Sequence, residues 1–160
     1  MTAASAPILI AYDGSDAARR AITETAELFP THPVLVTTVW EAGLAYSSIL
    51  SPMPEAGLQA VPMDIGEAKK VDQELESRAQ RIAEEGAELA RSSGLQAEAV
   101  AVAGDVDPAD AIVELARERH VAAIVVGSRG LTGLRARLEG STSSGVLKHA
   151  SHPVVVVHDD

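Results

Sequence analysis

Residues Ala122–Gly145 read AAIVVGSRGLTGLRARLEGSTSSG, an apolar run followed by a long glycine-rich segment and a cluster of hydroxyl side chains. The run Ala122–Val126 has the length and the β-branched content of a buried strand. Five glycines follow it, and glycine loses more conformational entropy on folding than any other residue. Packing alone does not favour such a segment. We therefore interpret it as a strand end that leads into a ligand-binding loop and then into a helix.

Four further apolar runs resemble Ala122–Val126, and we interpret all five as strands. Most are continuous, as expected for parallel strands that are covered on both faces. The run Gln96–Ala103 alternates instead, which indicates a position nearer an edge of the sheet. The remaining three runs are Ile8–Tyr12, Val34–Trp40 and Pro153–Val157.

Amphipathic helical patterns separate these strands. One begins at Asp16, one at Glu67, and one has Asp107 as N-cap with Pro108 at its first position. A last helix follows Gly140 and ends before Pro153. The expected core residues of the first three helices are Ala18, Ile22, Ala26 and Phe29; Val71, Leu75, Ile82 and Leu89; and Ile112 and Leu115.

Alternation of strands and helices along the chain predicts an α/β fold. We expect a three-layer α/β/α sandwich with a five-stranded, parallel, doubly wound sheet, in one domain that spans residues 1–160. The segment Glu41–Gly66 carries three prolines and no periodic pattern, so it is expected to be an irregular loop insertion. Two interpretations of this loop stay open, a tolerated insertion and a lid over the carboxyl ends of the strands.

Composition restricts the partners and the compartment. The chain has a formal net charge of −10, which argues against binding to nucleic acid or to anionic membranes. It has no cysteine, so neither disulfides nor thiolate metal sites are available. No apolar stretch is long enough to span a membrane, and the first residues do not resemble a signal peptide. These features lead us to expect a cytoplasmic protein.

Two strand ends carry the candidate site. Asp13 follows the first strand and Gly127 follows the fourth, and open α/β sheets bind ligands at the carboxyl ends of their strands. The segment from Gly127 to Leu138 contains three arginines and no acidic residue, so it favours an anion. Ser141, Thr142 and Ser143 then open the last helix, where free N–H groups and the helix dipole favour phosphate.

Several known phosphate loops do not fit. GSTSSG has the glycine spacing of a Walker A loop, but Val146 and Leu147 stand where lysine and a hydroxyl residue should follow. The G-x-G-x-x-G motif of dinucleotide-binding folds is absent, as are the SGGxDS and HxGH motifs of pyrophosphatases and nucleotidyltransferases. These absences argue against an enzyme of those classes.

The spacing Gly127-x2-Gly130-x9-Gly140-Ser141 resembles the universal stress protein family, in particular its ATP-binding branch with the motif G-x2-G-x9-G-[ST]. The resemblance extends over nearly the whole chain, from YDGSDAARRAI after the first strand to GSTSSGVLKHASHPVVVV at the end. It implies a Rossmann-like fold of the adenine nucleotide alpha hydrolase type. It also implies ATP as ligand, with Mg²⁺ or Mn²⁺ bound through the phosphates.

The resemblance also assigns roles to residues. Ala11 and Val39 would flank the adenine, Asp13 would lie near the ribose, the phosphates and the cation, and Val126 would border the ribose. The full set of implied nucleotide contacts is Ala11, Tyr12, Asp13, Val39, Val126, Gly127, Arg129, Gly130, Gly140, Ser141, Thr142 and Ser143. Two departures from the family pattern weaken the expected affinity, namely the carboxylate of Glu139 beside the phosphates and the bulk of Tyr12 beside the adenine.

Simpler interpretations of single residues remain open. Asp13 could cap the first helix together with Ser15 and Asp16, and hydroxyl residues are common at helix starts without any ligand. Arg135 and Arg137 are most simply solvent-exposed. His149 and His152 straddle a helix end and do not form a metal site. The acidic cluster Asp105, Asp107 and Asp110 is expected to cap a helix.

Three functions follow from these observations. The first is an ATP-binding stress-response or signalling module without catalytic residues. The second is a dimeric interaction module that has lost nucleotide binding, and the third is a weak ATPase or phosphoryl-transfer enzyme. The resemblance implies a homodimer that pairs through Pro153–Val157, because a bare apolar edge strand would invite aggregation.

Overall fold

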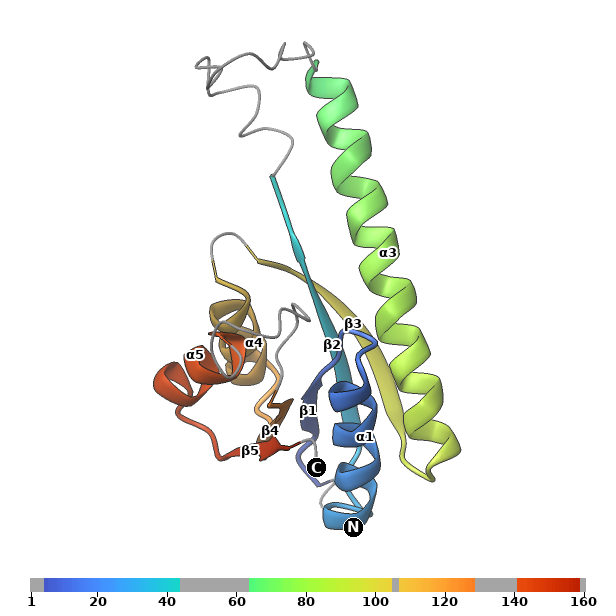
Figure 1. Ribbon diagram of the computed structural model, residues 1–160, viewed down its shortest axis with the longest axis vertical. Coiled ribbons are helices and arrows are strands. Elements are labelled where there is room, and N and C mark those ends of the chain that lie inside the picture. Colours follow the sequence, from blue (N-terminus) through green and yellow to red (C-terminus); the bar gives the residue numbers. More distant parts are fainter. Residues whose placement is uncertain (1–4, 44–63, 105–106, 129–140, 159–160) are drawn as a thin grey trace.

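The computed structural model describes residues 5–43, 64–104, 107–128 and 141–158, and these ranges form a sheet between two layers of helices (Figure 1). The strands are β1 (Ile8–Ala11), β2 (Val34–Glu41), β3 (Ala97–Gly104), β4 (Ala123–Gly127) and β5 (Val154–Val157). The helices are α1 (Asp16–Leu28), α3 (Ile65–Ser92), α4 (Pro108–Glu118) and α5 (Ser141–His149). The predicted α/β sandwich is therefore confirmed.

All five strands are parallel and lie in the order β3-β2-β1-β4-β5. From β1 the chain first adds β2 and β3 on one side and then adds β4 and β5 on the other. The order therefore reverses between β1 and β4, and open α/β sheets hold their ligands at such a reversal. The alternating strand β3 lies at an edge, as its sequence predicted.

Each face of the sheet has its own apolar core. Ile8, Ile10 and Val36 point to the side of α1 and α3, whereas Leu9, Leu35 and other side chains point to the side of α4 and α5. Figure 1 shows these two helix pairs on opposite sides of the sheet. Successive side chains of a strand point to opposite faces, so each strand must be apolar on both faces. This explains the continuous apolar runs in the sequence.

Helix caps follow the predicted pattern in α4. The carboxylate of Asp107 accepts a hydrogen bond from the N–H of Ala109 at 2.9 Å, and Pro108 stands at the first helical position. Ile112 and Leu115 are buried, as predicted. The acidic residue before this helix therefore acts as a cap.

Helix α3 begins earlier than the sequence predicts. It begins at Ile65, with Asp64 as N-cap in a capping box with Glu67, and so takes in the end of the segment expected to be a loop. The start of that expected loop, Glu41, belongs to β2. Residues 44–63 lie outside the described residues.

The large apolar side chains predicted for the core face of α3 are only half-buried. The fully buried positions of α3 are all small residues, which let the helix axis lie close to the sheet. These positions are Ala68, Ala79, Ala83, Gly86, Ala87 and Ala90. Gly86 shows why, since a Cβ there would come within 2.7 Å of the side chains of Tyr12 and Val36. The N-terminal half of α3 extends beyond the sheet, alongside the end of β2 (Figure 1).

The two edges of the sheet differ in how their backbone is covered. On the free edge of β3 the side-chain amide of Gln80 donates to the carbonyl of Ala99 at 3.5 Å and accepts from the N–H of Ala101 at 3.3 Å. Arg91 donates to the carbonyl of Ala97 at 3.0 Å. Helix α3 thus supplies this edge with partners.

Edge strand β5 has no equivalent cover among the described residues. The carbonyl of Pro153 accepts the N–H of Ile124 in β4 at 2.9 Å, and the carbonyl of Val157 accepts the N–H of Ser128, just after β4, at 2.7 Å. Alternation therefore turns the backbone groups of Val154 and Val156 outward. Within the ranges that the structure describes, no hydrogen bond reaches those outward groups.

Candidate functional site

The turn after β1 presents Asp13 at the carboxyl end of the sheet. Gly14 has a φ of +80°, a conformation that favours glycine, and it lets the chain turn from β1 into α1. Ser15 is the N-cap of α1, and Asp13 Oδ1 accepts the N–H of Ser15 at 2.9 Å. Asp13 therefore fixes the turn through one oxygen. Its second oxygen, Oδ2, accepts no hydrogen bond from the described residues.

A narrow crevice lies at the reversal of strand order. Its lining comes from the ends of β1 and β4 and from the first turns of α1 and α5: Ala11, Asp13, Ser15, Ala17, Ala18, Val126, Gly127, Thr142 and Ser143. Its cavity volume is about 20 Å³, enough for about one water molecule. The structure therefore brings together six of the residues that the sequence assigned to the site.

Close contacts hold the walls of this crevice together. A Cβ on Gly127 would lie 3.0–3.2 Å from Ala17 atoms, two of them backbone, so any side chain there would push β4 and α1 slightly apart. The Ser143 hydroxyl donates to the carbonyl of Gly127 at 2.8 Å and ties α5 to β4. The side chain of Ser143 is thus engaged, and its backbone N–H remains the group that faces an anion at this helix start.

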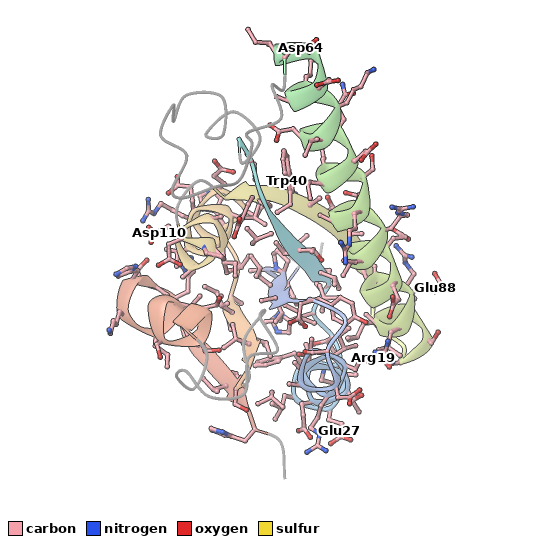
Figure 2. The ribbon with its side chains drawn as sticks, turned by 45° about the horizontal axis from the view of Figure 1, so that its top comes forward. Arg19, Glu27, Trp40, Asp64, Glu88 and Asp110 are labelled. Atoms are coloured by element: carbon pink, nitrogen blue, oxygen red, sulfur yellow. The ribbon has the colours of Figure 1, made fainter. Side chains whose placement is uncertain are left out.

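A larger cavity opens beside the crevice, between the end of β2 and α3. Its volume is about 360 Å³, within the usual range for small-molecule pockets. Trp40 stands on the side of β2 that faces α3 (Figure 2). The lining residues are Asp13, Thr38, Val39, Trp40, Glu41, Leu75, Arg78, Ala79 and Ile82. Asp13 is common to the crevice and the larger cavity, so the two are neighbours.

The end of β2 offers an unpaired backbone edge to this cavity. The N–H of Val34 donates to the carbonyl of Gln96, just before β3, and the carbonyl of Thr37 accepts the N–H of Tyr12, each at 2.8 Å. Alternate residues of β2 therefore face β3 and β1, and Val39 faces the β1 side. Pairing of β1 with β2 ends at Ala11 opposite Thr37. Among the described residues, nothing bonds to the N–H or the carbonyl of Val39.

Tyr12 lies away from both cavities. Its ring is fully buried on the α1 and α3 side, where it packs against Gly86 and Val36. Its hydroxyl donates to Glu85 Oε1 at 3.0 Å, and Arg19 donates to the same oxygen at 2.9 Å. Burial raises the pKa of Tyr12, and Arg19 and Glu85 act on it in opposite directions. The bulk of Tyr12 therefore occupies the core, and only its backbone lies near the site.

Part of the predicted site lies outside the described residues. These positions are Arg129, Gly130, Glu139 and Gly140, together with Arg135 and Arg137. Ser141 begins α5. Thr142 and Ser143 are both buried, in the first turn of that helix.

Sequence reasoning missed the contribution of α3 to the site. The helical spacing of Leu75 and Ile82 predicts core positions for both, and it predicts no role for Arg78. In the structure these residues line the larger cavity together with Thr38 and Trp40. The stripe Leu75, Ala79 and Ile82 was the available signal, but the sequence does not say how far the helix extends beyond the sheet.

The described residues offer neither a metal-binding cluster of side chains nor a membrane-spanning helix. They contain no group of three or more acidic, histidine or cysteine side chains arranged to hold a metal ion. No helix among them has the length and apolarity to cross a membrane. His149 instead pairs with Asp110 at 2.9 Å, at the far end of α5 from the site.

The universal stress protein family matches this chain over residues 5–158. Universal stress protein YxiE of Bacillus subtilis is 31% identical over 94% of this chain and 97% of its own length. Universal stress protein MJ0531 of Methanocaldococcus jannaschii is 28% identical over 94% of this chain and 80% of its own length.

Solved structures share the fold. Universal stress protein UspA from Lactobacillus plantarum superposes with a TM-score of 0.70 at 21% identity, covering 98% of this chain and 99% of that one. A universal stress protein in complex with cAMP superposes with a TM-score of 0.64 at 23% sequence identity, covering 98% of both chains. A universal stress protein family protein from Arabidopsis thaliana with AMP bound superposes with a TM-score of 0.62 at 18% sequence identity, covering 96% of this chain and 92% of that one. At these identities the likeness concerns the fold.

Proposed function

Since the chain belongs to the universal stress protein family, we propose that it binds an adenine nucleotide at the carboxyl ends of β1, β2 and β4. The proposed ligand is ATP with Mg²⁺ or Mn²⁺. Two structural neighbours hold cAMP and AMP, which supports this class of ligand. The proposed role is a nucleotide-dependent module in stress response or signalling.

The unpaired edge of Val39 carries this proposal. A free N–H and a free carbonyl on one residue match the donor and acceptor pairs along the edge of a nucleobase. They border a cavity of about 360 Å³ whose walls also include the apolar side chains of Trp40, Leu75 and Ile82, which suit the faces of a planar base. A strand edge left unpaired beside such a cavity has little value for folding, because backbone groups are normally paired.

The crevice between β1 and β4 would then take the ribose and the start of the phosphate chain. Ala11, Val126 and Gly127 border it with small or apolar surfaces, and the first turn of α5 presents free N–H groups and the positive end of its dipole. The crevice itself has room for only about one water molecule, so the phosphates would lie at its mouth, beside the first turn of α5. Arg129, Gly130, Gly140 and Ser141 would complete the phosphate contacts.

Asp13 suits the cation. Hard divalent cations prefer carboxylate oxygens, and Oδ2 of Asp13 is unengaged among the described residues while Oδ1 holds the turn. Asp13 would therefore contribute one oxygen, and phosphate oxygens would supply most of the remaining coordination.

We propose binding without efficient catalysis. Phosphoryl transfer needs positioned positive charge and a base or a water-orienting group. Within the described residues, Asp13 is the only carboxylate that lines the crevice, and one of its oxygens is engaged in the turn. The free edge of β5 supports the further proposal that two copies pair through Pro153–Val157.

Nucleotide retention tests the proposal. The purified chain should carry an adenine nucleotide, visible near 260 nm above the weak absorbance of one tryptophan and two tyrosines, and identifiable by mass spectrometry of an acid extract. Gly140→Val should lose it, because Gly140 belongs to the glycine motif. Gly133→Val is the matched control, since Gly133 lies in the same segment but outside the motif. Unchanged retention in Gly140→Val, or no binding of Mg-ATP by the native chain, would contradict the proposal.

A further inference from the structure

The ladder between β1 and β2 stops one step earlier than its register allows. Tyr12 donates its N–H to the carbonyl of Thr37 at 2.8 Å, so the next bond in sequence would run from the N–H of Val39 to the carbonyl of Tyr12. That bond is not formed. The Thr38 hydroxyl donates to the Tyr12 carbonyl instead, at 2.8 Å.

Thr38 is well placed to divert this carbonyl. Its side chain is buried on the α1 and α3 side of the sheet, and its hydroxyl reaches across to the neighbouring chain segment. The Tyr12 carbonyl therefore accepts from this hydroxyl and not from the N–H of Val39. Both backbone groups of Val39 are then left for another partner at the wall of the larger cavity.

We propose that Thr38 is a positioning residue, which ends the β1–β2 ladder so that the backbone N–H and carbonyl of Val39 can bond to a nucleobase. Thr38 itself does not touch the base in this account. The proposal rests on the proposed nucleotide binding and adds to it a reason why the binding edge exists. The proposal gives Thr37 no such role, because the buried hydroxyl of Thr37 has no hydrogen-bond partner among the described residues.

Amide hydrogen exchange by NMR on the full chain tests the first half without any ligand. In the native chain the N–H of Val39 should exchange much faster than that of Tyr12, which is bonded to Thr37. Thr38→Val removes the hydroxyl at nearly constant shape, so the Tyr12 carbonyl becomes free to accept from Val39. Exchange of the Val39 amide should then slow at least about ten-fold. Thr38→Ser keeps a hydroxyl and should leave exchange fast.

Equilibrium dialysis with Mg-ATP tests the second half. Thr38→Val should weaken binding about five- to ten-fold, the effect of one lost hydrogen bond, whereas Thr38→Ser and the neighbouring control Thr37→Val should bind as the native chain does. Equal exchange of the Val39 amide in the native chain and in Thr38→Val would overturn the positioning role even if ATP binds. Conversely, a native chain that shows the predicted exchange but binds no nucleotide would overturn the ligand assignment alone.

Discussion

Tyr12 and Asp13 show how neighbouring residues divide between stability and binding. The family resemblance assigned both to one site, Tyr12 as the last residue of the expected strand and Asp13 as the residue directly after it. In the structure the side chain of Tyr12 points into the core beneath α3, whereas Asp13 lines the crevice at the carboxyl end of β1. Successive side chains of an extended segment point in opposite directions. The place of these two residues at the end of a strand was therefore predictable. The face of the sheet to which each side chain points was not, because it depends on where the strand ends.

Thr37 is expected to destabilise the protein. Its side chain is 1% exposed, and its hydroxyl finds no hydrogen-bond partner in the part of the chain that the structure describes. A buried polar group without a partner costs free energy, so Thr37→Val should raise the free energy of unfolding by about 1 kcal/mol. Urea unfolding followed by circular dichroism measures this change.

Thr25→Val is the matched control for that experiment. Thr25 is also buried, but its hydroxyl donates to the carbonyl of Ala21 at 2.7 Å, so its replacement should lower the free energy of unfolding. Equal destabilisation by both substitutions would mean that Thr37 has a partner in solution.

The buried phenol of Tyr12 makes stability depend on alkaline pH. Burial raises its pKa in the folded state, so the folded protein holds this proton more tightly than the unfolded chain. The resulting stabilisation is complete below the unfolded pKa of about 10 and is lost as the pH rises through the folded value. Tyr12→Phe should therefore lose less stability than the native chain between about pH 8 and pH 11. Urea unfolding at both pH values checks this, and parallel losses in the two proteins would refute it.

At the scale of elements, the strands and helices were largely predictable from periodicity and capping. The five apolar runs became the five strands, and the cap at Asp107 lies where the sequence placed it. The packing of α3 was not predictable in the same way. Its buried face is a row of alanines and one glycine, and a hydrophobic pattern gives little weight to small residues.

Gln80 is expected to protect one edge of the sheet. Its side-chain amide bonds to the carbonyl of Ala99 and the N–H of Ala101, the two groups that one residue of an added parallel strand would use. An exposed edge invites association, so Gln80→Ala should form species larger than the native assembly. Sedimentation velocity measures the distribution of sizes.

Gln73→Ala is the control for the sheet edge, since Gln73 lies on the same helix, lines only an outer groove and has no bond to β3. It should sediment like the native chain, for which two copies paired through β5 are expected. If Gln80→Ala also behaves like the native chain, the side-chain amide does not protect β3.

At the scale of the whole molecule, the sequence predicted that residues from two strand ends share a crevice, and it did not predict the larger cavity beside that crevice. Asp13 and Gly127 were predicted to share a crevice because parallel strands end at one edge, and they do. The larger cavity depends on a helix that extends beyond the sheet and on the early end of the β1–β2 ladder. Both are properties of packing between segments far apart in the chain, which single-sequence patterns do not encode.

The central claim is that one end of the sheet binds an adenine nucleotide through backbone groups. A titration of the isotope-labelled full chain with Mg-ATP, followed by amide NMR shifts, tests it most directly. The account predicts saturable shifts centred on Asp13, Val39, Gly127 and Ser143, with little change at Gln96 or His120 at the opposite ends of the strands. Absence of shifts at millimolar nucleotide, or shifts centred on that opposite end, would contradict it.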